Sequence, residues 1–326
     1  MSKPKVYVTR AIPEANIAAL RAEFEVEVNP DDRALTKEEL KEKIRGRDAV
    51  VSLLTDTIDG EVLDAAGPQL KIVANYAVGF NNFDLAAATQ RKVILTNTPG
   101  VLDDATATHT FTLLLATARR IAEADKYVRD GKWQGWGPLF FIGLDVDGKT
   151  LGIAGLGRIG KNVARKARGF DMKILYSDMQ RDAAFEADTG AVFVDKATLL
   201  KESDFLTLHV PLTPQTKHYI GAAELKQMKP TAVLINAARG PVVDEKALVQ
   251  ALREKWIFGA GLDVFENEPA LEPGLAELDN VIIVPHIASA TPGTRLAMGE
   301  IAVGNVKKVL NGLPPDTCVN PEVLGE

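Results

Sequence analysis

The sequence is poor in the residues that form covalent cross-links and soft-metal sites. Its 326 residues include one cysteine, Cys318, and four histidines. A single cysteine cannot form an internal disulfide, and nothing in its use indicates an oxidising compartment. Thiolate metal cages need several cysteines, and the histidines show no paired ligand spacing, so no metal site is expected.

Hydrophobic runs long enough to cross a bilayer are also lacking. The longest, such as residues 113–115, are far shorter than the ~20 apolar residues of a spanning helix. Residues 1–10 lead directly into a strand-like run, without the apolar stretch of a signal peptide. We therefore expect a cytoplasmic protein with no membrane partner.

Positive charge is scarcer than negative charge. The chain has 38 Lys and Arg against 44 Asp and Glu, a formal net charge of -6. No global basic field would attract phosphates, which argues against nucleic acid as a partner. The composition, 46% hydrophobic and 25% charged, is ordinary for a globular protein, and the length suits two domains.

Short apolar runs alternate with amphipathic stretches in the first hundred residues. Residues 5–10, 49–54 and 71–77 have the composition of strands bounded by turn residues. Thr36 followed by Glu39 forms a capping box, which fixes the start of one helix between them. Alternation of this kind predicts a parallel sheet covered by helices on both faces.

The pattern changes after residue 100 and then repeats. One long, largely apolar helix is expected over residues 101–129, and a loop rich in Trp, Gly and Pro follows at 131–143. A second series of strands and helices begins at Lys149, and a last helix is expected over 292–310. The sequence therefore predicts an α/β protein with two doubly wound, parallel-sheet, Rossmann-like domains.

A glycine-rich turn lies near the start of the second series. Gly155, Gly157 and Gly160 form a G-x-G-x-x-G after a predicted strand and before a predicted helix. The first glycine permits a tight turn, the second lets backbone approach a pyrophosphate, and the third lets the helix pack on the strand. A purely structural turn is the alternative. With strand, glycines and helix in order, we favour a dinucleotide site at the helix N-terminus.

An acidic residue follows at the spacing that such a site needs. Asp178 ends the next predicted strand, 18 residues after Gly160 (178 − 160 = 18), near the roughly 20-residue spacing for a carboxylate on the ribose hydroxyls of NAD. It would repel the 2′-phosphate of NADP, so NAD(H) is the expected coenzyme. Arg181, three residues on, would attract that phosphate, and NADP(H) therefore remains an alternative.

Three further charged or imidazole side chains follow predicted strands. Arg239, Glu268 and His286 should converge, because the carboxyl ends of parallel strands meet at one edge. Reduction of a keto acid needs an acid for the nascent alkoxide, which a His paired with a carboxylate supplies, and a cation for the substrate carboxylate. From spacing alone each has an equal alternative: a surface charge for Arg239 and Glu268, a core residue for His286.

The roles of the other three histidines and of Asp263 are less clear from the sequence. Nothing acid–base surrounds His209 or His218 in the sequence, and His109 lies in the long helix, so all three are interpreted as structural. Asp263 either orients the nicotinamide side of a coenzyme or caps a loop.

These stretches together resemble the D-isomer-specific 2-hydroxyacid dehydrogenase family. The resemblance rests on residues 155–160, 209–213, 236–240, 261–269 and 285–290, and residues 78–84 extend it into the first half of the chain. It covers essentially the full length, and the joint set of motifs is highly specific.

The resemblance implies a substrate domain of residues 1–99 and 288–326, with a coenzyme domain of residues 100–287 inserted and the active site in the cleft. It implies that His286 is the general acid/base, Glu268 its partner and Arg239 the group that binds the substrate carboxylate and carbonyl. Backbone N–H groups of Val78 and Gly79 would also hold the carboxylate. The implied coenzyme contacts, beyond the three glycines, are Thr106, Arg158, Ile159, Asp178, His209, Pro211, Thr216, Ala237, Arg239, Asp263, His286 and Ser289.

Two features resemble the glyoxylate/hydroxypyruvate branch of that family. Trp136, in the loop at 131–143, matches a Trp that reaches the partner subunit's substrate pocket, although a plain interface role is the alternative. Leu53 would line the same small pocket. The helix at 101–129 and this loop resemble the family's dimer arm, so a homodimer through the coenzyme domain is expected.

Three functions are therefore compared. The expected one is NADH-dependent reduction of glyoxylate to glycolate and of hydroxypyruvate to D-glycerate. A D-3-phosphoglycerate dehydrogenase would need basic residues for the phosphate and often carries a C-terminal regulatory domain, which the end at Glu326 disfavours. An NAD-sensing corepressor with this fold usually carries a long disordered tail, which is not seen here.

Overall fold

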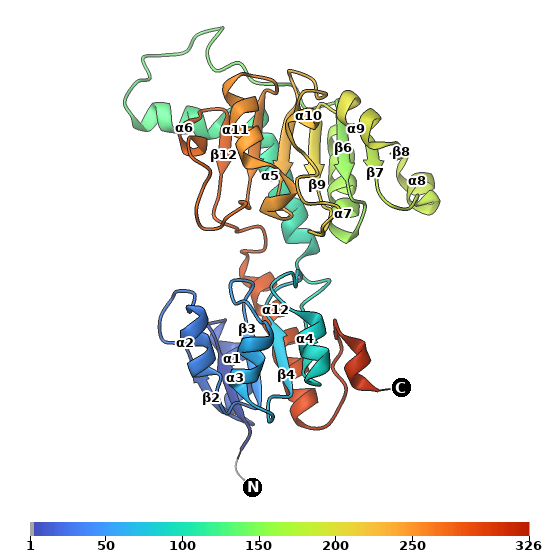
Figure 1. The fold of residues 1–326 in the computed structure, drawn as a ribbon. Coiled ribbons are helices and arrows are strands. Elements are labelled where there is room, and N and C mark those ends of the chain that lie inside the picture. The colour runs from blue at the N-terminus through green and yellow to red at the C-terminus, as the bar shows by residue number, and fades with distance from the viewer. Residues whose placement is uncertain (1–2, 326) are drawn as a thin grey trace. The chain divides into compact units, whose positions relative to one another are not determined.

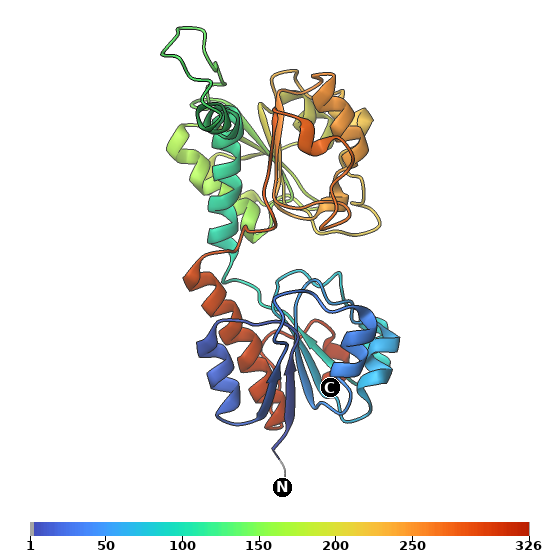
Figure 2. The same ribbon diagram turned by 90° about the vertical axis from the view of Figure 1, so that its left-hand side faces the viewer.

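The computed structural model of the chain describes residues 3–325. It divides into two compact units, Met1–Leu102 with Ala290–Glu326 (unit 1) and Asp103–Ser289 (unit 2). In each, a fully parallel sheet carries helices on both faces (Figures 1 and 2). Among the described residues, no helix combines the length and the apolar character needed to cross a bilayer.

The sheet of unit 1 has five strands in the order β2-β1-β3-β4-β5. The chain places β2 on one side of β1 and β3 on the other, so the loops after β1 and β3 leave in opposite directions. This is the position at which open α/β sheets bind ligands. The strands are β1 (Lys5–Val8), β2 (Glu25–Val28), β3 (Ala49–Ser52), β4 (Ile72–Asn75) and β5 (Ile94–Thr96).

The helices of unit 1 cover its sheet with apolar faces. Leu40 and Val62 pack with strand residues such as Tyr7 and Val50 in one core. The helix predicted from the capping box begins after Thr36, as expected, with both reciprocal bonds present. On this face lie α2 (Lys37–Lys43), α3 (Gly60–Ala66) and α4 (Leu85–Gln90), and on the other α1 (Glu14–Arg21) and α12 (Pro292–Leu310); a 3-10 turn at Pro321–Leu324 ends the described chain.

The sheet of unit 2 has seven strands in the order β12-β11-β10-β9-β6-β7-β8. Its order reverses between β6 and β9, where Ala154 lies beside Leu208. The prediction of two doubly wound parallel sheets is confirmed. The strands are β6 (Thr150–Ala154), β7 (Lys173–Ser177), β8 (Val192–Phe193), β9 (Phe205–Leu208), β10 (Val233–Asn236), β11 (Gly259–Leu262) and β12 (Val281–Ile283).

Two cores hold the helices of unit 2 to this sheet. One includes Phe111 and Val163 from the helices on one face, and the other includes Leu199 and Leu248 from those on the opposite face. The helices are α5 (Asp103–Ala118), α6 (Ile121–Arg129), α7 (Arg158–Ala167), α8 (Ala183–Thr189), α9 (Lys196–Glu202), α10 (Ala222–Leu225) and α11 (Glu245–Arg253), with 3-10 turns at Arg168–Phe170, Gly240–Val242 and Leu275–Glu277.

The prediction of a single long helix over residues 101–129 is wrong. The chain forms two helices, α5 and α6, and Arg120 between them has a left-handed φ of 54°. The break is set by a distant segment, because the N–H of Leu144 donates to the Ala118 carbonyl at 2.8 Å. Glu123 and the ring of Phe141 then hold the Arg120 guanidinium. The apolar pattern of the sequence contains no sign of this capping.

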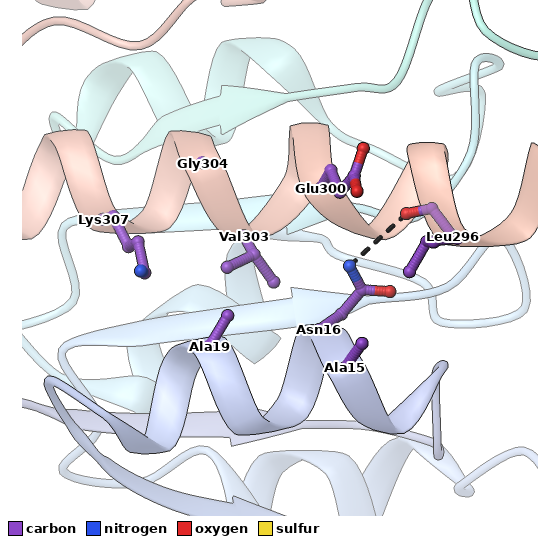
Figure 3. Close-up of a pocket in the computed structure, with 8 residues that line it drawn as sticks. All are labelled: Ala15, Asn16, Ala19, Leu296, Glu300, Val303, Gly304 and Lys307. Carbon is purple, nitrogen blue, oxygen red and sulfur yellow. Dashed lines mark hydrogen bonds between the residues drawn. The ribbon is translucent and has the colours of Figure 1, made fainter.

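A close helix crossing in unit 1 depends on one glycine. Asn16 of α1 points toward α12 and donates to the Leu296 carbonyl at 3.4 Å (Figure 3). Its Oδ1 lies against Gly299, where an added Cβ would be 2.1 Å from that oxygen. Asn16 is buried, so it has little room to shift. Gly299 therefore fixes how closely the two helices approach.

We predict that Gly299→Ala lowers the free energy of unfolding by about 1–3 kcal/mol, since it overpacks a buried contact. Gly304→Ala in the same helix is the matched control, because no atom lies within 4 Å of its added Cβ. It should raise that free energy by about 0.5–1 kcal/mol through helix propensity alone. Guanidinium unfolding of both variants measures this, and shifts in the same direction would contradict the crossing.

Candidate active site

The residues expected to bind a coenzyme lie, with one exception, at the carboxyl edge of the unit 2 sheet. Loops after six strands contribute to it, as the parallel order requires. The exception is Thr106, which is buried in α5. After β6 come Gly155, Gly157, Arg158, Ile159 and Gly160, after β7 Asp178, after β9 His209, Pro211 and Thr216, after β10 Ala237 and Arg239, after β11 Asp263, and after β12 His286 and Ser289.

The glycine turn has the geometry that a pyrophosphate site needs. Gly155 has φ 91°, and its added Cβ would lie 2.8 Å from the backbone after β9, so only glycine fits there. At Gly160 a Cβ would be 2.3 Å from the Gly155 carbonyl, which brings α7 close to the turn. Gly157 faces open space and has no side chain to cap the first turn of α7. The N-terminus of α7 is therefore available to an anion.

Asp178 is held beside this turn. Its carboxylate accepts from the N–H of Leu156 in the glycine turn and from the N–H of Met179, both at 2.6 Å. Each oxygen of a carboxylate has lone pairs for a further donor. Asp178 is exposed, so those lone pairs can accept from the hydroxyls of a ribose.

The loop after β9 is also ordered by its own hydrogen bonds. The Thr216 hydroxyl donates to the Pro211 carbonyl and accepts from the N–H of Thr213 at 2.8 Å. Burial lowers the pKa of His209 to about 3, which keeps its imidazole neutral. The open glycine turn, the uncapped helix and the Asp178 carboxylate together fit a nicotinamide dinucleotide.

Two of the three expected catalytic side chains form a pair. His286 Nδ1 lies 2.9 Å from Glu268 Oε2, and the two side chains are 26% and 31% exposed. The other Glu268 oxygen accepts from the N–H of Phe265 at 3.0 Å. Burial raises the pKa of Glu268, but the hydrogen bond and charge of His286, the N–H of Phe265 and the charge of Arg239 together lower that pKa overall. The pair thus keeps a carboxylate against the imidazole and leaves Nε2 for a ligand.

Arg239 lies near this pair. Burial lowers the pKa of its guanidinium, and the negative charge of Glu268 acts in the opposite direction. Asn236 fixes the turn after β10, because its side-chain amide donates to the Arg239 carbonyl at 2.9 Å. The structure thus brings the predicted cation, carboxylate and imidazole into electrostatic contact.

Asp263 holds the loop that carries His286. It is fully buried and accepts from the N–H groups of Ile287 at 2.7 Å and Ala288 at 2.9 Å. Its carbonyl accepts from the N–H of His286, which keeps that residue at a left-handed φ of 54°. Such a conformation persists only where surrounding contacts impose it. The loop-capping interpretation of Asp263 therefore describes its visible contacts, and a role toward a nicotinamide stays a prediction.

The sequence did not predict two histidine–carboxylate pairs, or the hydrogen bonds by which Glu245 holds the loop around Glu268. His109 Nε2 lies 3.2 Å from Asp263, and His218 Nε2 lies 2.7 Å from Glu266, so both histidines have acidic neighbours from distant parts of the chain, and their interpretation as structural stays a prediction. Glu245, buried at the start of α11, accepts from the N–H groups of Glu266 and, at 3.3 Å, Glu272. These two residues flank Glu268. No local signal in the sequence connects Glu245 with that loop.

The expected substrate residues of unit 1 follow β3 and β4. The Leu53 N–H donates to buried Asp56 at 2.8 Å. The carbonyls of Val78 and Gly79 accept from the side-chain amides of Asn97 and Asn75, at 2.8 and 2.9 Å. Within residues 3–325 the N–H groups of Val78 and Gly79 donate to no acceptor. They are therefore available to an anion.

Trp136 lies in an exposed apolar segment of unit 2. Its side chain is 86% exposed, and Leu139 is 83% exposed. In α6 no residue is buried, and Ile121 and Val128 are about half exposed. Single exposed apolar residues need no explanation, but a group of them in one segment indicates an interaction surface.

Comparison with known proteins agrees with this geometry. A sequence model described as the NAD binding domain of D-isomer specific 2-hydroxyacid dehydrogenases matches residues 111–288. The glyoxylate reductase of Thermococcus onnurineus is 55% identical over an alignment of 326 positions, which covers 99% of this chain and 97% of that protein. The chain belongs to the D-isomer specific 2-hydroxyacid dehydrogenase family.

Solved structures are similar to this chain in both sequence and fold. A protein of Thermus thermophilus is 44% identical with a TM-score of 0.91, and the match covers 97% of this chain and 99% of that one. The NADPH-dependent glyoxylate/hydroxypyruvate reductase of Sinorhizobium meliloti, in complex with NADP and malonate, is 34% identical with a TM-score of 0.86. That match covers 98% of this chain and 97% of the other.

We predict that His286→Ala raises the pKa of Glu268, because burial then acts with less opposition. A carboxyl group with a lowered folded-state pKa adds stability above its unfolded-state pKa and loses it as pH falls to the folded-state pKa, so the raised pKa in the variant should make this pH-dependent contribution smaller. Carbon-13 NMR of the carboxyl groups measures the shift. Glu39, whose pKa of about 2 depends on Arg33 in unit 1, is the control and should not move.

Proposed function

We propose that this chain is a nicotinamide-dependent reductase of small 2-keto acids, which converts glyoxylate to glycolate and hydroxypyruvate to D-glycerate. The observation that carries the proposal is the His286–Glu268 pair, at 2.9 Å, beside Arg239 and at the same sheet edge as the glycine turn. Relatives at 50–55% identity that are named glyoxylate reductases support the choice of substrate.

The residues divide the chemistry among them. A reduced nicotinamide, when bound, supplies the hydride that reduces the keto carbon. His286 gives a proton from Nε2 to the carbonyl oxygen, since its Nδ1 is engaged by Glu268. The Glu268 carboxylate stabilises the protonated imidazole before transfer and fixes the ring orientation. The proton and the hydride together convert the ketone to an alcohol.

The carboxylate of the substrate needs separate recognition. The planar Arg239 guanidinium offers two parallel donors, which match a carboxylate or a carboxylate with its adjacent carbonyl. In unit 1, the N–H groups of Val78 and Gly79, for which residues 3–325 provide no acceptor, bind the carboxylate, and Leu53 limits the size of the group beyond the keto carbon. A backbone site of this kind fits any small 2-keto acid, so the small side chain of the substrate is selected by space.

The proposal includes a preference for NADH over NADPH. The Asp178 carboxylate would lose a ribose hydroxyl partner to the 2′-phosphate and face a like charge. The loss of a charge-assisted hydrogen bond alone costs about 1.5–3 kcal/mol, or roughly 10–100-fold in affinity. The ratio of kcat/KM for NADH and NADPH measures this preference.

We also propose that two chains associate through α6 and the loop at residues 131–143. The support is the exposed apolar surface of Ile121, Val128, Trp136 and Leu139, which a partner would cover. Trp136 in particular belongs to the residue type most enriched at the centre of interfaces. Light scattering at micromolar concentration measures the oligomeric state.

We predict that the wild type reduces glyoxylate and hydroxypyruvate with a reduced nicotinamide, and that His286→Ala loses about 10²–10⁴-fold in kcat. Coenzyme affinity should change little, because the variant removes the proton donor alone. Steady-state turnover on a panel of 2-keto acids, with coenzyme titrations, measures both. Activity of the variant within tenfold of the wild type would exclude His286 as the acid.

We predict that Glu268→Gln moves the pH profile of reduction to lower pH. Reduction needs the protonated imidazole, and the lowered pKa of Glu268 keeps a stabilising carboxylate beside it. The amide removes that charge, so activity should fall at a lower pH in the reducing direction, and the rise of alcohol oxidation should move with it. Profiles of kcat/KM in both directions test this, and unchanged limbs would contradict the pairing.

A further inference from the structure

The carboxylate of Glu186 in α8 forms an ion pair with Arg181, the cation that follows Asp178 in the chain. Arg181 lies three residues after Asp178, and Glu186 binds its guanidinium through two nitrogens. Arg181 Nε is 2.9 and 3.0 Å from the two Glu186 oxygens, and Nη2 is 2.6 Å from Oε2. One bidentate edge of the guanidinium, formed by Nε and Nη2, is therefore occupied by a carboxylate of the same chain, which also fixes the direction of the side chain.

Glu186 is itself held from the core of unit 2. The hydroxyl of Tyr176, a fully buried residue of β7, donates to Glu186 Oε1 at 2.8 Å. The same hydroxyl accepts from the backbone N–H of Asp182 at 2.8 Å, so Tyr176 contacts both Glu186 and the residue that caps α8. The Glu186 side chain is only 13% exposed, whereas Arg181 is 65% exposed. Glu186 is thus the fixed partner and Arg181 the exposed one.

Lys161, a second cation of this region, is neutralised in the same way. Its Nζ lies 2.6 Å from Asp182 Oδ2, and the second Asp182 oxygen caps α8 through the N–H of Phe185. Arg181 and Lys161 are therefore each matched by one carboxylate, so neither offsets the repulsion between the Asp178 carboxylate and a nearby phosphate.

We propose that Glu186 is a coenzyme-specificity residue, which holds Arg181 away from an adenosine 2′-phosphate and so makes the exclusion by Asp178 effective. The inference rests on the proposed dinucleotide site and deepens it. Asp178 supplies the repulsion, and the Tyr176–Glu186 pair prevents Arg181, three residues after Asp178, from offsetting it. Exchange of Glu186 should therefore relax the preference without any change at Asp178.

The test measures binding of adenosine nucleotides by calorimetry, independently of turnover. The affinity for AMP measures binding to the part of the site that NAD and NADP share. The affinity for adenosine 2′,5′-bisphosphate adds the effect of the 2′-phosphate. In Glu186→Gln the affinity for the bisphosphate, relative to AMP, should rise about three- to tenfold, since a released guanidinium can bind phosphate. Asp188→Asn in the same helix is the matched control, because it removes the same charge. Asp188 makes no ion pair within the described chain, and its variant should leave the ratio unchanged.

Two further variants make the outcome decisive. Arg181→Ala in the Glu186→Gln background should abolish the gain, and Arg181→Ala alone should leave the wild-type ratio within about twofold. A wild-type ratio that drops fivefold in Arg181→Ala would overturn the proposal, even if Glu186→Gln failed to fold. AMP binding without any gain in Glu186→Gln would overturn this proposal alone, whereas failure of both AMP and NADH to bind would overturn the dinucleotide site as well.

Discussion

The parallel order of the strands in unit 2 is the constraint on which the rest of this structure depends. Because every strand runs the same way, the loops after β6, β7 and β9–β12 end at one edge. Gly155 and His286, which are 131 residues apart in the chain (286 − 155 = 131), therefore lie at the same edge. Each α/β repeat adds one loop to it. Chemistry is concentrated where the fold brings many short loops together, while the sheet below stays apolar and rigid.

Buried charge at this edge is stabilised by backbone N–H groups and by opposite charges. Asp263 and Glu245 are almost completely buried, and each accepts from two backbone N–H groups of a loop beside the His286–Glu268 pair. Leaving a buried carboxylate without such donors would cost several kcal/mol. The same bonds that satisfy these carboxylates also fix the backbone around Glu268 and His286. The same hydrogen bonds therefore both stabilise these loops and fix the positions of Glu268 and His286.

Charge pairing also separates the groups that can bind ligands from those that cannot. Arg181 and Lys161 are exposed cations by sequence, yet both are engaged by acidic residues of one loop and helix. The N–H groups of α7 and of Val78 and Gly79 carry no formal charge but are open to an anion. A count of charged residues therefore does not reveal which groups at this site can bind an anion. The chain has a net charge of -6 and still offers anion sites, because they are made from backbone.

Features that depend on neighbouring residues could be predicted from the amino-acid sequence alone. The capping box at Thr36, the glycine turn at Gly155 and the alternation of strands and helices are set by local sterics and hydrogen bonding. The residues that follow each strand were therefore predictable, as were the two doubly wound sheets. Known family motifs then suggested roles for Arg239, Glu268 and His286, and the parallel order explains why these side chains meet.

Contacts between segments far apart in the chain could not be predicted in this way. The end of α5 at Ala118 depends on Leu144, the Glu268 loop depends on Glu245, and buried Asp263 faces His109. Even Arg181, five residues from Glu186, is fixed by a carboxylate whose position depends on Tyr176 in the core. Such pairs carry no periodic or spacing signal, because their geometry exists only after the helices have packed on the sheet.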